Sequence, residues 1–131
     1  MSPIIGTIFL RVTPPESIRE LNGQDMSSLT MKRTFAAIVE RTSKWDPAKT
    51  PQEQAGFEQH VKYMGSLEAE GFIVLAGLLH KSNDVLFLFR AESEAEVRRR
   101  LAADPWQQDG HARLVRLEEL NIRTGPAELR D

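Results

Sequence analysis

The chain of 131 residues contains no cysteine, which excludes disulfide bonds, zinc–thiolate centres and thiol nucleophiles. It also lacks any apolar run that approaches the roughly 18 residues needed to cross a bilayer. The apolar segment 1–10 has no basic residue ahead of it, so it is not a typical signal peptide. These absences predict a cytoplasmic protein without a membrane partner.

Excess charge of one sign is absent as well. Seventeen basic and 19 acidic side chains give a formal net charge of −2, so there is no broad electrostatic reason to expect nucleic acid as a partner. The three histidines lack His-x-x-x-His or Glu-x-x-His spacing, and no glycine-rich phosphate loop or serine–histidine triad is visible. We therefore expect neither a metal nor a cofactor.

With 40% apolar and 27% charged residues, the composition is that of one ordinary globular domain. We divide the chain into an N-terminal extension at 1–32, a domain at 33–126 and a short tail at 127–131. The extension begins with an apolar, β-branched stretch at 4–12, which predicts an additional strand. Polar residues and turn signals follow it, so the rest of the extension is expected to be a loop.

From residue 33 onward, apolar runs predict strands at about 35–39, 72–79, 85–91 and 112–122. Thr50, Pro51 and Glu53 have the pattern of a capping box, which predicts a helix from there to about residue 70. A second capping box opens a helix at 93–102, and Pro105 should end it. The order β-α-β-β-α-β predicts an α+β, ferredoxin-like sheet with both helices on one side.

The apolar patterns of the first helix and of the hairpin predict how each element packs. Helical spacing gives the first helix a buried face, made of Phe57, Val61, Met64 and Leu67. The hairpin segments 72–76 and 85–89 are apolar at consecutive positions, whereas an antiparallel strand with one solvated face alternates. Helices cover one face of this sheet, so we expect a second copy of the chain to cover the other in a homodimer.

His60 and Asp104 are the candidates for chemistry. His60 lies three residues after Phe57 and four before Met64, beside the apolar face of the first helix. Its spacing alone favours a core histidine bonded to a backbone carbonyl over a functional base. Asp104 precedes Pro105 and Trp106, a pattern typical of a turn at a helix end, although it would also place a carboxylate beside an aromatic wall.

A resemblance joins these two residues. The segment Glu58-Gln59-His60, the stretch 64–71 and Val74-Leu75-Ala76-Gly77 are followed by Ala102-Ala103-Asp104-Pro105-Trp106 and then Gly110. In this order, over about residues 34–120, these motifs resemble the YCII-related family. The resemblance implies a dimeric α/β barrel of ferredoxin-like subunits, with His60 and Asp104 as a histidine–aspartate active site.

The chain departs from the family pattern in three places. The family's Gly-Pro after the second strand is Gly77-Leu78 here, an aromatic residue near the end of the last strand is replaced within 120–122, and the extension 1–32 lies outside the common core. The first two changes leave the shape of a pocket, and so its substrate, open. Gly77, Tyr63 and Trp106 are the candidate substrate-binding residues.

Two functions remain open at this stage. In the first, Asp104 fixes the tautomer of His60, which then transfers protons in an elimination or isomerisation of a small molecule. In the second, the chain is a non-catalytic binding or accessory module with the same fold and dimer.

His80 and His111 stand at strand ends, where a loop or capping role is the simpler interpretation. The basic run 98–100 is expected to lie on a solvated helix face.

Overall fold

A computed structural model of the chain describes residues 32–130. Its elements follow in the order β1 (Arg33–Arg41), the 3-10 turn η2 (Pro51–Glu53), α2 (Phe57–Ala69), β2 (Ile73–Leu78), β3 (Val85–Ala91), α3 (Glu94–Ala102), α4 (Pro105–Asp109), β4 (Ala112–Leu120) and the 3-10 turn η3 (Ala127–Leu129). The strand expected at 4–12 and the rest of segment 1–31 lie outside the described residues.

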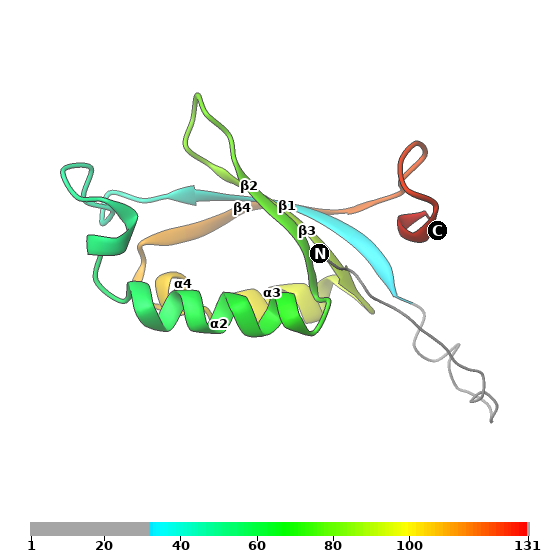
Figure 1. The fold of residues 1–131 in the computed structure, drawn as a ribbon, viewed down its shortest axis with the longest axis horizontal. Coiled ribbons are helices and arrows are strands. Elements are labelled where there is room, and N and C mark those ends of the chain that lie inside the picture. The colour runs from blue at the N-terminus through cyan, green and yellow to red at the C-terminus, as the bar shows by residue number, and fades with distance from the viewer. Residues whose placement is uncertain (1–31, 131) are drawn as a thin grey trace. The chain divides into compact units, whose positions relative to one another are not determined.

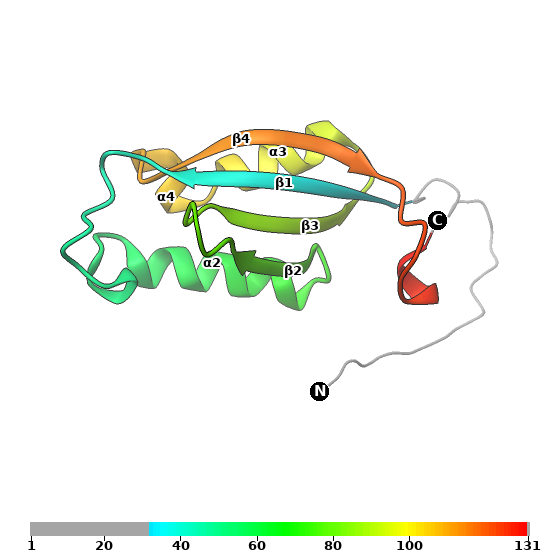
Figure 2. The ribbon, with the colours of Figure 1, turned by 90° about the horizontal axis from the view of Figure 1, so that it is seen from above.

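The four strands form one antiparallel sheet in the order β2-β3-β1-β4. Figure 1 shows the helices together beneath this sheet, and Figure 2 shows the strands side by side with α2 next to β2. This is the strand order of a ferredoxin-like fold, so the α+β prediction is confirmed. None of the helices within residues 32–130 is long and apolar enough to span a membrane.

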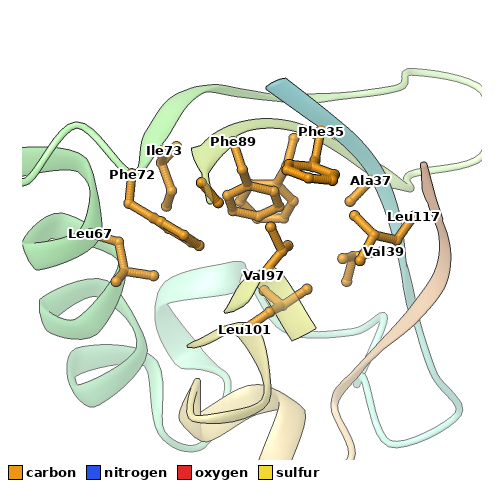
Figure 3. Packing of buried hydrophobic residues seen from close by; sticks show 12 residues of the cluster. Phe35, Ala37, Val39, Leu67, Phe72, Ile73, Phe89, Val97, Leu101 and Leu117 are labelled. Carbon is orange, nitrogen blue, oxygen red and sulfur yellow. The ribbon is translucent and has the colours of Figure 1, made fainter. Parts of the chain in front are cut away.

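Strand register places the core on the helix side of the sheet. Phe35 is paired with Phe89, and Ala37 with Phe87, so these side chains share one face of β1 and β3. They are buried against α2 and α3 through Leu67, Val97 and Leu101. Figure 3 shows the rings of Phe35, Phe72 and Phe89 gathered above these aliphatic side chains.

The first helix begins later than predicted. The capping box does form, since the Thr50 N–H donates to a carboxylate oxygen of Glu53 at 2.9 Å, but it caps only the 3-10 turn η2. Gly56, at φ 80°, then adopts the left-handed conformation that glycine tolerates, and α2 begins at Phe57. The prediction of one helix from residue 51 was therefore wrong, because a glycine turn separates the capping box from the helix.

The predicted buried face of this helix is only partly correct. Leu67 is buried at 1% exposure, but Val61 is 46% exposed, and Phe57 and Met64 are half-buried. The C-terminal end of α2 therefore packs into the core, whereas its N-terminal half stands off from the sheet.

The opposite face of the sheet carries apolar side chains with no helix over them. Register pairs Ala36 with Leu88 and Ile38 with Leu86, and Leu75 of β2 lies opposite Leu88. These five residues, which we call the open-face patch, are half-buried or exposed. The apolar pattern on both faces of the hairpin is thus real within the described residues.

Candidate functional site

His60 projects from the N-terminal half of α2, the part of the helix that stands off from the sheet. Its ring nitrogen Nδ1 lies 2.7 Å from Oδ1 of Asp104, and its side chain is 20% exposed. An ionised carboxylate can only accept, so with Asp104 ionised Nδ1 carries the proton, and Nε2 has no hydrogen-bond partner among residues 32–130. The two residues, 44 positions apart, are thus hydrogen-bonded to each other.

Asp104 is fixed by the local sequence. Pro105 disfavours helical geometry at the residue before it, and Asp104 has an extended backbone with ψ 129°. It therefore becomes the N-cap of α4, a short helix that the sequence did not predict, and its Oδ1 accepts the N–H of Trp106 at 3.2 Å. The carboxylate is 2% exposed and accepts hydrogen bonds from the Trp106 backbone N–H and from His60.

The indole ring of Trp106 packs against the flat face of the His60 imidazole. Its ring is stacked on His60 with centroids 3.8 Å apart and planes 15° from parallel. Its Nε1 donates to the carbonyl of Ala55 at 2.8 Å, and Trp45 meets it edge-on at 5.1 Å. A hydrogen bond at Nδ1 and a stacked indole together restrict the orientation of the imidazole.

The loop that carries Trp45 is anchored by one amide. Gln54 is buried, and its side chain accepts the N–H of Asp46 at 3.1 Å while donating to the Asp46 carbonyl at 2.8 Å and to the Lys49 carbonyl at 3.3 Å. Sequence reasoning missed this residue, since a glutamine after a 3-10 turn carries no recognisable signal.

A cavity of 520 Å³ separates the N-terminal half of α2 from the sheet. Its walls are mostly apolar and include Phe57, Val61, Met64, Ile73, Val85, Phe87 and Leu101. His60, Asp104 and Trp106 line it as well. The volume falls within the range of small-molecule sites, and the other polar or charged residues in the wall are Glu40, Arg41, Glu68 and Gln107.

One further polar group in the wall has no partner. Nε2 of Gln107 is a buried side-chain nitrogen without a hydrogen-bond acceptor among residues 32–130. An unmade hydrogen bond of this kind costs about 1–3 kcal/mol. It is therefore a donor available for a ligand oxygen after a small rotation of the side chain.

Two of the candidate binding residues lie elsewhere. The Tyr63 hydroxyl donates to the Arg100 carbonyl at 2.6 Å and so ties α2 to α3, and Tyr63 does not line the cavity. Gly77 lies opposite Leu86, on the open face of the sheet, and is not a lining residue either. The structure thus brings Trp106 to the histidine–aspartate pair, but not Tyr63 or Gly77.

A second histidine–aspartate pair lies behind Trp106. His111 Nδ1 is 2.8 Å from Oδ1 of Asp109, which also accepts the His111 backbone N–H at 2.9 Å. Burial opposes ionisation of Asp109, but these hydrogen bonds, the His111 charge and Lys44 outweigh it and lower the pKa of the carboxyl. His111 does not line the cavity, and its ring lies 6.2 Å from that of Trp106. Sequence reasoning assigned it only a capping or loop role.

The site offers acid–base chemistry and no metal centre. Among residues 32–130, no group of three or more histidine and carboxylate side chains is placed to hold a metal ion. His60 can accept or donate a proton at Nε2, while the buried Asp104 carboxylate stabilises the protonated ring. An apolar cavity around one oriented imidazole suits proton transfer on a small molecule.

Comparison with known proteins assigns the chain to a family. The family model of the YCII-related domain matches residues 38–121, which include β1 from Ile38 onward, every helix and strand through β4, and both members of the pair. No curated protein matches the chain. Because the matched segment spans more than half of the sequence, the chain belongs to the YCII-related family.

Proposed function

We propose that this protein is a small enzyme that uses His60 and Asp104 for general acid–base catalysis on a small molecule. The observation that carries the proposal is the 2.7 Å contact between Nδ1 of His60 and the buried carboxylate, at the wall of a 520 Å³ apolar cavity. Nε2 would remove a proton beside a carbonyl group. In an isomerisation the protonated ring returns that proton to another atom of the substrate. In an elimination the electron pair of the broken C–H bond forms a double bond as a leaving group of the substrate departs with its own electron pair.

The arrangement of the pair supports catalysis over a purely structural role. A core histidine would be sealed from solvent, whereas His60 is 20% exposed and borders a cavity. Gln107 supplies a donor for an oxygen that gains negative charge when the proton leaves, which is the stabilisation an enolate requires.

The test is proton exchange with solvent. We would incubate a panel of small ketones, keto acids and lactones in deuterated water and follow loss of the hydrogens beside the carbonyl by proton NMR. Wild type should accelerate exchange in some members, and His60→Asn should reduce it by about 10²-fold or more. Asparagine retains a side-chain N–H that can reach Asp104, and equal melting temperatures would show that the fold is kept. Equal exchange by both proteins, or none above the rate in buffer, would contradict the proposal.

We further propose that the protein acts as a homodimer through the open-face patch, Ala36, Ile38, Leu75, Leu86 and Leu88. A contiguous apolar surface on three neighbouring strands gains free energy when a second copy covers it. Leu86→Lys should shift the mass measured by light scattering from dimer to monomer, because Leu86 belongs to the patch and does not line the cavity. Leu78→Lys is the control, because Leu78 is a leucine of the same hairpin that pairs with Val85 on the other face. A wild-type monomer would end this proposal without affecting the acid–base one.

A further inference from the structure

A second hollow adjoins the cavity that contains His60. It has a volume of 410 Å³ and shares Arg41, Trp45 and Pro51 with the first. Its remaining lining is polar, with Thr42, Lys49, Ser82 and Asn83 around Pro47. The two hollows therefore meet at Arg41, Trp45 and Pro51, and the outer one has a mostly polar lining.

Two cationic side chains face this outer hollow. Neither Arg41 nor Lys49 forms an ion pair within the part of the chain that the structure describes. Three acids close to them in the sequence are engaged elsewhere: Glu40 pairs with Arg113, the Asp46 carboxylate accepts the Ala48 N–H, and the Glu53 carboxylate accepts the Thr50 N–H. None of these three acids therefore forms an ion pair with Arg41 or Lys49.

Arg41 is held in a way that leaves its donors available. Its guanidinium carbon lies 4.1 Å from the centre of the Trp45 ring, which is a cation–π contact. The N–H groups of its guanidinium form no hydrogen bond among residues 32–130, so they can bind a carboxylate or phosphate in the two-pronged geometry that arginine favours.

A continuous series of rings connects this arginine to the histidine. The steps are 4.1 Å from Arg41 to Trp45, 5.1 Å from Trp45 to Trp106 and 3.8 Å from Trp106 to His60. Their sum is an upper limit on the distance from the guanidinium to the imidazole. Both residues also line the same cavity, so one ligand that fills it can contact both.

The acidic residue at the other end of the cavity does not oppose this arrangement. Glu68 also lines the cavity, but it follows His60 by eight residues on α2, which separates the two backbones by roughly 12 Å along the helix axis. Glu40 lines the cavity as well, but its carboxylate pairs with Arg113, and the buried Asp104 carboxylate is bonded to His60. The cationic residues that line the outer hollow are Arg41 and Lys49.

We infer that the ligand of this protein is an amphipathic anion, with an apolar, ring-sized body in the inner cavity and a carboxylate or phosphate group bound by Arg41 and Lys49. The inference rests on the proposed function, because it takes the inner cavity as the ligand site, and it adds the substrate class. The anionic group would fix the apolar body so that the same carbon always faces Nε2 of His60.

The experiment compares charged probes with neutral ones of the same shape. A series of phenyl-substituted and cyclohexyl-substituted carboxylic acids, each with its carboxamide, and phenyl phosphate would be titrated against the full chain by calorimetry. Wild type should bind at least one acid about tenfold more tightly than its amide, and the preference should shrink as salt rises. Phenyl phosphate binding would indicate a phosphate ligand, and preference confined to the acids a carboxylate ligand.

Four variants test which side chains cause the preference for acids over amides. Arg41→Met keeps an unbranched chain over Trp45 and should abolish the preference, while Lys49→Met should reduce it. Lys62→Met removes an exposed charge from α2 that lines neither hollow, and it should change nothing. His60→Asn should leave the preference intact while it abolishes proton exchange, so the two proposals fail separately. Equal affinity for acids and amides without binding of phenyl phosphate, no binding of any acid or of phenyl phosphate, or unchanged binding of the anionic probes by Arg41→Met would overturn the inference.

Discussion

The two halves of α2 face the same sheet but meet it differently. At the C-terminal half, Leu67 is buried among Phe72, Val97 and the other core side chains, and the space is filled. At the N-terminal half, Val61 is half-exposed and a 520 Å³ cavity lies between helix and sheet. The filled half holds the helix in place, and the hollow half leaves room for a ligand beside His60.

The largest effect expected from this comparison concerns stability. Leu67→Ala should lower the free energy of unfolding by about 2–5 kcal/mol, because it leaves a cavity in a packed core. Val61→Ala, on the same helix, should cost no more than about 0.5 kcal/mol, because that side chain already borders empty space. Urea denaturation followed by circular dichroism measures both. Equal losses would mean that the two halves do not differ in packing.

The next prediction separates the two roles of Asp104, which is both the N-cap of α4 and the hydrogen-bond partner of His60. Asp104→Ala removes the N-cap of α4 as well as the partner of His60, and should cost about 0.5–2 kcal/mol. Asp104→Asn keeps a side-chain oxygen that caps as well as aspartate does, so most of that loss should be restored. The proton exchange proposed for wild type should nevertheless fall in Asp104→Asn, because the buried negative charge that stabilises protonated His60 is gone. Exchange unchanged in the asparagine variant would reduce Asp104 to a structural cap.

This dual role explains how far the sequence could predict the site. Asp before Pro indicated a helix end, and Asp104 is indeed an N-cap. The sequence spacing could not reveal that the same oxygen meets His60, because the contact depends on how α2 and α4 pack. Only the family resemblance joined the two residues, and the structure places them 2.7 Å apart.

The strands of the fold could be predicted from the sequence, whereas the start of α2 and the cavity could not. Strand positions and their order followed from apolar runs and turn signals, because each strand's pattern is local. The start of α2 was missed because Gly56 breaks a helix whose capping box looked complete. The cavity was missed because periodicity identifies the apolar face of a helix but not how closely that face approaches its neighbours. Arg41, at the end of β1, gave no signal beyond its charge.

A larger side chain at Val61 should fill the cavity beside the N-terminal half of α2. Val61→Trp should place an indole in the cavity and abolish binding of the anionic probes, while the free energy of unfolding changes by no more than about 1 kcal/mol. Lys62→Trp introduces the same side chain one position along, on the exposed surface, and should leave binding unaffected. Calorimetric titration of both variants tests this. Retained binding in Val61→Trp would place the ligand outside the cavity.

The smallest effect concerns the pair behind Trp106. Because the pKa of Asp109 is lowered in the folded protein, its ionised form stabilises the fold above the ordinary aspartate value of 3.8, and that contribution disappears as pH falls through the lower folded value. The side chain is 40% exposed, so solvent screening keeps the contribution small. The stability difference between wild type and Asp109→Asn should therefore favour wild type at pH 6 and shrink below pH 3.8. Urea midpoints at each pH measure it, with Asp84→Asn, whose carboxyl pairs with no cation among the described residues, as the control. A stability difference that does not change with pH would mean that the negative charge of Asp109 does not stabilise the fold through its hydrogen bonds to His111.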